Sequence, residues 1–183
     1  MPWLGNEERE NLKSTIDRSW LTEGPECAKA LDTLKTLLGC KYVTFAPNGT
    51  LGLFLSLLAL DLPSGSEVLV PDFTFFASCS SIAMAGLKPV VVDVDKNTFQ
   101  IDINDLRRKI TSKTRLIMPV HIYGQGCQIL EVMKIAKEFD LRVIEDACQA
   151  LGVRFCDGET KDSEKNNQGL TQKYKHLGTF GDI

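Results

Sequence analysis

The residues whose types could do chemistry stand just after apolar runs that are typical of strands. Asn48-Gly49-Thr50 opens an apolar helix, and the free N–H groups and positive dipole end of a helix N-terminus attract phosphate. Gly49 would let the backbone approach a ligand closely, and Thr50 adds a hydroxyl donor. A plain helix cap by Asn48 is the favoured interpretation of these residues taken alone.

An aromatic cluster and an acid follow two other predicted strands. Asp72-Phe73-Thr74-Phe75-Phe76 could stack a ring on a planar ligand, although at least one or two of its phenylalanines should be core. Asp146 ends an apolar strand, where a carboxylate is costly to bury unless a cation or several donors pair with it. A protonated ring nitrogen would serve, as would a helix cap or a structural ion pair.

His121 and Tyr123 follow a further strand and could contact a substrate or cofactor, although a lone histidine is more often packed and hydrogen-bonded. The order of these features is more telling than any one of them. A helix start, an aromatic group and an acid are what a phosphorylated aromatic cofactor requires. Pyridoxal phosphate fits, because an acid can keep its pyridinium protonated so that the ring acts as an electron sink.

The elements that position these residues alternate from residue 41 onward. Short β-branched runs alternate with amphipathic helices, which predicts an α/β domain with a mainly parallel sheet flanked by helices. Ligands bind beyond the carboxyl ends of the strands in such sheets. The predicted strands are 42–45, 67–70, 89–94, 116–120 and 141–144, and the predicted helices are 48–60, 75–85, 102–110 and 129–139.

The rest of the chain is organised around this domain. We expect a helical segment over residues 1–40, with helices at 7–19 and 25–39, ahead of a partial α/β domain over 41–183. The polar stretch 157–175 lacks apolar periodicity and predicts a surface-loop insertion.

Composition excludes several classes of protein. The 183 residues carry a net charge of -3, with no basic excess for nucleic acid or an anionic membrane. The apolar stretch 51–62 is far shorter than the ~20 residues of a membrane span, and the N-terminus has no secretory signal. Six scattered cysteines and two histidines argue against a metal site or a disulfide framework. We therefore expect a cytoplasmic protein.

Taken together, the motifs resemble the DegT/StrS-type (DegT/DnrJ/EryC/StrS) sugar aminotransferases, which use pyridoxal 5'-phosphate on the aspartate aminotransferase (fold type I) scaffold. Each motif is weak, but seven occur in the family's order and spacing over almost the whole chain. The stretches are Trp20-Leu21-Thr22-x-Gly24-Pro25, Asn48-Gly49-Thr50, Val70-Pro71-x-Phe73-Thr74-Phe75-x-Ala77, Pro89-Val90-x-Val92-Asp93-Val94-Asp95, Pro119-Val120-His121-x-Tyr123-Gly124-Gln125, Glu145-Asp146-Ala147-x-Gln149-Ala150-x-Gly152 and Gly178-x-Phe180-Gly181-Asp182.

The resemblance implies roles for individual residues. Gly49 and Thr50 would bind the cofactor phosphate, and Phe75 would stack on the pyridine ring. Asp146 would pair with the ring nitrogen, and Gln149 would lie near the 3'-oxygen or the phosphate. Thr22, His121 and Tyr123 are the candidates for the substrate side.

The resemblance also implies an activity and a partner. An amino acid, typically glutamate, would donate its amino group to a keto group of a nucleotide-linked sugar, in surface polysaccharide or amino-sugar biosynthesis. A homodimer with active sites at the subunit interface is implied. The family's Schiff-base lysine follows the Gly-Asp-Ile position, so it would lie beyond residue 183, and Lys173 and Lys175 stand before that motif. We expect a truncated part without the C-terminal small domain, and negligible transamination by this chain alone.

Three alternatives stay open. The first is a sugar dehydratase of the same family, in which histidine replaces the cofactor lysine. The second is a non-catalytic binding or dimerisation module made from half of the fold. The third, a nicotinamide-dependent oxidoreductase, ranks low because Asn48-Gly49-Thr50-Leu51-Gly52 lacks the G-x-G-x-x-G spacing.

Overall fold

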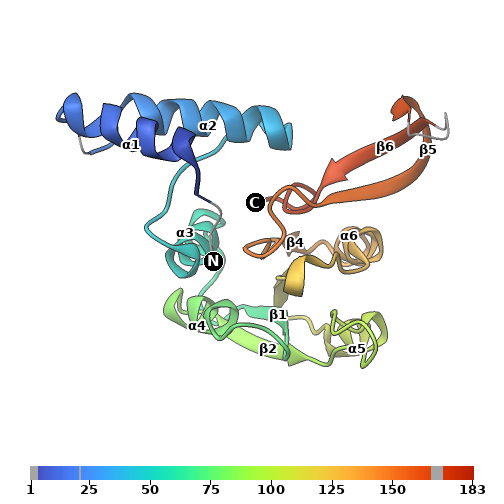
Figure 1. The fold of residues 1–183 in the computed structure, drawn as a ribbon. Coiled ribbons are helices and arrows are strands. Elements are labelled where there is room, and N and C mark those ends of the chain that lie inside the picture. Colours follow the sequence, from blue (N-terminus) through green and yellow to red (C-terminus); the bar gives the residue numbers. More distant parts are fainter. Residues whose placement is uncertain (1–3, 21, 166–170) are drawn as a thin grey trace. The chain divides into compact units, whose positions relative to one another are not determined.

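A computed structural model describes the backbone of residues 4–20, 22–165 and 171–183, and it describes side chains outside 157–173 (Figure 1). The chain divides into two compact units, Met1–Phe45 and Ala46–Ile183. We call them the N-terminal unit and the sheet unit.

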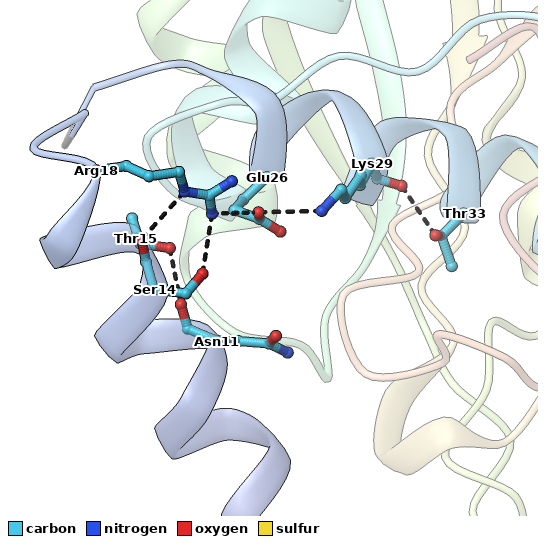
Figure 2. A network of polar contacts seen from close by, with 7 residues as sticks. All are labelled: Asn11, Ser14, Thr15, Arg18, Glu26, Lys29 and Thr33. Atoms are coloured by element: carbon cyan, nitrogen blue, oxygen red, sulfur yellow. Dashed lines mark hydrogen bonds and ion pairs between the residues drawn. The ribbon is translucent and has the colours of Figure 1, made fainter.

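The N-terminal unit consists of two helices, α1 (Asn6–Asp17) and α2 (Pro25–Leu38), and no residue of either helix is buried. As predicted, α2 begins at a proline and ends before Gly39, whose φ of 65° is the left-handed conformation of a helix C-cap. Figure 2 shows the polar contacts of this unit. Arg18 donates to the backbone oxygen of Ser14 at 3.1 Å and pairs with Glu26 at 2.6 Å, and Lys29 pairs with the same carboxylate. Charged surface groups therefore join the two helices.

The sheet unit contains a four-stranded parallel sheet in the order β2-β1-β3-β4. Its strands are β1 (Glu67–Pro71), β2 (Lys88–Val92), β3 (Thr114–Ile117) and β4 (Arg142–Val143). The helices are α3 (Gly49–Ala59), α4 (Ala77–Met84), α5 (Ile103–Lys109), α6 (Ile129–Glu138) and the short η1 (Ile122–Gly124). The strand predicted at 42–45 does not form, because the described residues give this segment no neighbouring strand to bond with.

Apolar side chains cover both faces of the sheet. Residues along a strand point alternately to opposite faces, so Leu69 joins the cluster that contains α5 and α6 residues. Its neighbours Val68 and Val70 join the other cluster, with α3 and α4 residues. Two covered faces are the expected environment of a parallel sheet.

After β4 the chain forms an antiparallel pair of strands, β5 (Arg154–Lys165) and β6 (Thr171–His176). The stretch 157–175, predicted as a surface loop, is therefore mostly strand, and residues 166–170 lie outside the described part. A two-stranded ribbon is held by backbone hydrogen bonds and needs no apolar periodicity, so the polar sequence did not indicate these strands. In the described part of the chain, no helix has the length and apolar character needed to cross a membrane.

The last described segment returns from β6 to the sheet. The Asp182 N–H donates to the Val143 carbonyl at 2.8 Å, and the Glu145 N–H donates to the Ile183 carbonyl at 3.1 Å. Residues 178–183 thus run beside the end of β4, at the edge of the sheet where the strands terminate.

Candidate functional site

A pocket of about 320 Å³ opens at the carboxyl edge of the sheet. Its volume lies at the lower end of the range for small-molecule sites. Segments that follow three strands line it together with the start of α3. The lining residues are Asn48, Gly49, Thr50, Leu53, Thr74, Phe75, Ala77, Val120, His121, Ile122, Asp146, Cys148 and Gln149. All five predicted cofactor-binding residues and His121 are among them.

The first turn of α3 forms one wall. The Asn48 side chain caps the helix by accepting from the Leu51 N–H at 3.0 Å. The Gly52 N–H donates to the Asn48 carbonyl at 2.9 Å, so the N–H groups of Gly49 and Thr50 precede the first intrahelical donor. The helix cap and the open first-turn amides therefore coexist.

Gly49 also allows close packing at this wall. A Cβ atom at this position would lie 3.0 Å from the Cys148 sulfur. The segment that carries Cys148 and Gln149 can therefore pack directly against the start of α3, and both segments face the same pocket.

Asp146 forms the acidic part of the lining and is only 7% exposed. Its Oδ2 accepts from the buried Ser78 hydroxyl at 2.8 Å, and its Oδ1 accepts from the Cys148 N–H at 3.3 Å. Because Ser78 donates to the carboxylate, the Thr74 hydroxyl 2.9 Å away must donate to Ser78. A chain of two hydroxyls therefore orients Asp146 and meets part of the cost of its burial.

The three phenylalanines that follow β1 are all exposed, which contradicts the expectation that one or two of them are core. Phe75 lines the pocket with 72% of its surface exposed, and Phe76 is 76% exposed. Phe73 instead packs its ring against Phe99, at 5.2 Å between centroids, and against Tyr123 at 6.1 Å. Phe73, Phe99 and Tyr123 thus form an aromatic cluster, and Phe73 and Tyr123 are next in sequence to the lining residues Thr74 and Ile122.

Gln149 joins two turns at the pocket. Its Oε1 accepts from the Tyr123 N–H, and a Cβ atom at Gly124 would lie 3.0 Å from the Gln149 carbonyl. Tyr123 has a φ of 58°, an unusual backbone conformation for an aromatic residue, and its side chain is 74% exposed. Tyr123 is therefore next to the pocket but is not part of its lining.

The His121 side chain is fully buried, and both ring nitrogens are engaged inside the protein. Nε2 lies 2.9 Å from Oε2 of Glu145, and Nδ1 accepts from the Cys127 N–H at 3.3 Å. The ring therefore offers no free nitrogen to a substrate, which was one of its two predicted roles. Thr22, the third substrate-side candidate, is exposed in the bend before α2, in the N-terminal unit.

Among the described residues, no lysine or arginine lines the pocket. Lys175 stacks over the Phe180 ring, 4.4 Å from its centroid, and the side chain of Lys173 lies outside the described part. Burial, and then the Asp146 charge, raise the pKa of the Cys148 thiol to about 11, so this thiol stays protonated at neutral pH. Among the described side chains, no group of three or more His, Cys, Asp and Glu residues could hold a metal ion.

No role was predicted for four residues that shape this site: Thr74, Ser78, Glu145 and Cys148. All four lie inside the quoted motifs or one position past them. Thr74 and Ser78 are four residues apart at a helix start, which is a spacing that allows two hydroxyls to meet. Glu145 is next to Asp146, and strand alternation sends such neighbours to opposite faces.

A parallel α/β sheet with a helix start, an exposed ring and a buried acid around one pocket defines a domain suited to a phosphorylated ring compound. The model of the DegT/DnrJ/EryC1/StrS aminotransferase family matches residues 2–183, and the chain belongs to this family.

Three similar proteins illustrate this relationship. The GDP-perosamine synthase of Escherichia coli O157:H7 is 36% identical over 183 residues, which are 100% of this chain and 46% of that protein. NtdA from Bacillus subtilis, solved with bound cofactor PMP, is 35% identical with a TM-score of 0.76 over 81% of this chain and 35% of NtdA. A GDP-4-keto-6-deoxymannose-3-dehydratase with a trapped PLP–glutamate geminal diamine is 25% identical, with a TM-score of 0.82 over 99% of this chain and 44% of the dehydratase.

The chain therefore spans less than half the length of these relatives. The fold-class prediction is confirmed: the parallel sheet with flanking helices is that of the large domain of pyridoxal phosphate-dependent fold type I proteins.

Proposed function

We propose that this chain forms the cofactor-binding part of a pyridoxal phosphate-dependent sugar aminotransferase. The observation that carries the proposal is the convergence of the first α3 turn, the Phe75 ring and the Asp146 carboxylate on one pocket. In this proposal Gly49 and Thr50 bind the phosphate, and Gln149 lies near the phosphate or the ring oxygen.

The lining fits the cofactor part by part. The open amides of α3 suit a phosphate dianion, and the exposed Phe75 ring offers a flat apolar surface. When bound, pyridoxal phosphate supplies an electron sink for carbanion chemistry. Asp146 would hold a proton on the ring nitrogen, and Ser78 orients the carboxylate by donating to Oδ2 at 2.8 Å. The chain's own residues thus bind the cofactor and set its charge.

The substrates in this proposal are an amino acid donor, typically glutamate, and a nucleotide-linked keto sugar. The 36% identity to a GDP-perosamine synthase supports a nucleotide sugar in surface polysaccharide or amino-sugar biosynthesis. Because no lysine is found among the described lining residues, we expect residues 1–183 alone to transaminate at a negligible rate. We also propose that the protein is cytoplasmic and forms a homodimer. Sedimentation velocity would test the dimer by the mass of the particle.

Binding of pyridoxamine phosphate to the 183-residue chain tests the proposal. This probe has the phosphate, ring and nitrogen of the cofactor, but its amine cannot condense with surface lysines as the aldehyde does. Calorimetry should detect binding of pyridoxamine phosphate. Pyridoxamine, which lacks the phosphate, should bind much more weakly. Asp146→Asn should weaken binding about tenfold, which corresponds to about 1.4 kcal/mol. The exposed Glu138→Gln is the matched control. Equal affinities for wild type and Asp146→Asn would contradict the proposal.

A sugar dehydratase of the same family is the second candidate. The observation that favours it is the dehydratase structure that superposes on 99% of this chain with a TM-score of 0.82. Both candidates use the same pocket for the same cofactor, so cofactor binding does not separate them. Sequencing of the coding region beyond the Ile183 codon would do so, since a lysine in the expected stretch supports the aminotransferase and a histidine supports the dehydratase.

A further inference from the structure

Glu145 is a buried acid beside the pocket that the proposed cofactor contacts leave unexplained. Its side chain has no exposed surface, and it is not among the residues that line the pocket. Burial by itself would raise the pKa of Glu145, but hydrogen bonds from His121 and from the backbone N–H groups of Gly181 and Gly178 lower it below its ordinary value. The group is therefore a carboxylate at neutral pH.

Both carboxylate oxygens of Glu145 are saturated by donors. Oε2 lies 2.9 Å from Nε2 of His121 and accepts from the Gly178 N–H, also at 2.9 Å. Oε1 accepts from the N–H groups of Gly181, at 2.7 Å, and Phe180. Three of the four donors thus belong to one short segment, residues 178–181, which we call the 178–181 turn.

The fourth donor is fixed by its own surroundings. The Cys127 N–H donates to Nδ1 of His121 at 3.3 Å, so Nδ1 is an acceptor and the proton of the neutral ring is on Nε2, facing Glu145. The constellation of cysteine, histidine and acid is not a nucleophile site. The Cys127 thiol is buried, and burial followed by the Glu145 charge raises its pKa to about 12.

Glu145 and Asp146 are adjacent carboxylates whose side chains have different partners. Asp146 points into the pocket toward Ser78, whereas Glu145 points toward the 178–181 turn. Backbone bonds connect the two sites, because the Asp146 N–H donates to Pro119 at 2.9 Å and the His121 N–H donates to Asp146 at 3.0 Å. Movement of Glu145 would therefore be felt at the pocket through its neighbour and through His121.

The 178–181 turn is seated closely against β4. A Cβ atom at Gly181 would lie 2.6 Å from the Val143 carbonyl, and one at Gly178, where φ is 83°, would lie 2.8 Å from the Ala147 Cβ. The Val143 N–H donates to Asp182 Oδ2 at 2.8 Å. These close contacts restrict where the turn can lie, and the Glu145 carboxylate, with its four donors, holds the turn in that place.

We propose that Glu145 is a positioning residue that seats the 178–181 turn on the carboxyl edge of the sheet and fixes it relative to Asp146 in the pocket. This proposal rests on the proposed function only for the identity of the pocket's ligand. The four hydrogen bonds of one buried carboxylate, three of them to a single turn, carry it.

Residue-resolved amide exchange by NMR tests the seating. In the wild-type chain the amides of Gly178, Phe180 and Gly181 should be protected. Glu145→Gln keeps the shape but replaces one oxygen by an NH₂ donor, which must face another donor. We expect exchange at these amides to become at least about tenfold faster, with β1 amides unchanged. Glu138→Gln should leave all of them unchanged. Unprotected turn amides in the wild type would overturn the proposal even if the variant does not fold.

The positioning role needs two further readouts. The ¹⁵N shifts of the His121 ring should show the Nε2–H tautomer in the wild type, and the Nε2 resonance should shift in Glu145→Gln because its charged hydrogen-bond acceptor is lost. The affinity of the folded variant for pyridoxamine phosphate should fall at least fivefold. A purely structural Glu145 would lower stability but leave this affinity unchanged, and that result would overturn the positioning role. If the wild type itself does not bind the probe, the proposed function fails, whereas the exchange and tautomer results still decide the seating.

Discussion

The two units of this chain are stabilised by different interactions. In the N-terminal unit no helical residue is buried, and exposed ion pairs such as Arg18–Glu26 join the helices. In the sheet unit apolar clusters cover both faces of the sheet, and the buried acids Glu145 and Asp146 each have two or more donors. Apolar burial supplies most of the free energy of folding, so the sheet unit should hold most of the stability.

This difference also explains which unit can hold a ligand-binding site. A buried carboxylate acquires a defined direction from its partners, as Asp146 does from Ser78. An exposed ion pair such as Arg18–Glu26 stays partly hydrated and is screened by salt, which makes it a weak reference point for a ligand. The pocket is accordingly formed in the sheet unit.

The strongest test of the comparison is a matched pair of leucine truncations. Leu57 is 1% exposed and Leu12 is 63% exposed. Leu57→Ala should reduce the free energy of unfolding by about 3 kcal/mol through lost burial and a residual cavity. Leu12→Ala should change it by less than about 0.5 kcal/mol. Urea denaturation followed by far-UV circular dichroism measures both. A large cost for Leu12→Ala would mean that α1 is covered in solution, for instance by a second copy of the chain.

The next test concerns the pH dependence of the buried acid. The folded-state pKa of Glu145 is lower than its ordinary value of 4.5, so the unfolded chain binds the proton more readily. The stability that Glu145 contributes is complete above about pH 4.5 and is lost as the pH falls through the lower folded-state pKa. Glu145→Gln should cost about 2 kcal/mol at pH 7, because several hydrogen bonds to a charge are weakened.

Stability measured from pH 7 to pH 3 checks this expectation. The decline below pH 4.5 should be smaller in Glu145→Gln than in the wild type, because the variant has no proton to take up at this position. Glu138→Gln, with its exposed side chain, provides the reference slope. Parallel declines in the wild type and Glu145→Gln would contradict the role assigned to the four donors.

A smaller effect is expected from the hydroxyl that orients Asp146. Ser78→Ala removes the donor to Oδ2 and leaves Thr74 without its acceptor, so it should cost about 1 kcal/mol. Thr15→Ala in α1 removes an exposed hydroxyl that donates to Asn11 at 2.9 Å, and it should be nearly neutral. Denaturation of both variants, together with pyridoxamine phosphate affinity for Ser78→Ala, makes the comparison. A neutral Ser78→Ala with full affinity would remove the hydroxyl chain from the site.

Local patterns predicted most of the sheet unit. The helix that opens at Gly49 and the strand at 67–70 were foreseen from a cap residue and a β-branched run, which are signals inside a few neighbouring residues. The segment at 42–45 failed for the opposite reason. Its β-branched pattern matched a strand, but a strand also needs a neighbour, and the sequence does not encode pairing locally.

The site shows the same limit. Most residues that line the pocket follow β1, β3 or β4, as strand topology predicts for Asp146, whereas Gly49 follows a predicted strand that does not form and lies at the start of α3. The partners that orient them come from distant positions. Glu145 meets the 178–181 turn more than thirty residues away, and Ser78 meets Asp146 across 68 residues. No spacing rule foresees such contacts, which arise only when the strands have packed.

The smallest effect should come from the ion pairs of the N-terminal unit. Arg18→Ala removes the contact to Glu26 and the bonds to Ser14 (Figure 2). Exposed ion pairs are screened by salt and offset by side-chain entropy. We therefore expect the melting temperature of the chain to fall by less than about 2 °C at low salt, and not at all at high salt. Differential scanning calorimetry at the two salt concentrations measures this. A loss that persists at high salt would show that Arg18 does more than pair with an exposed charge. The N-terminal unit would then not depend on exposed ion pairs alone.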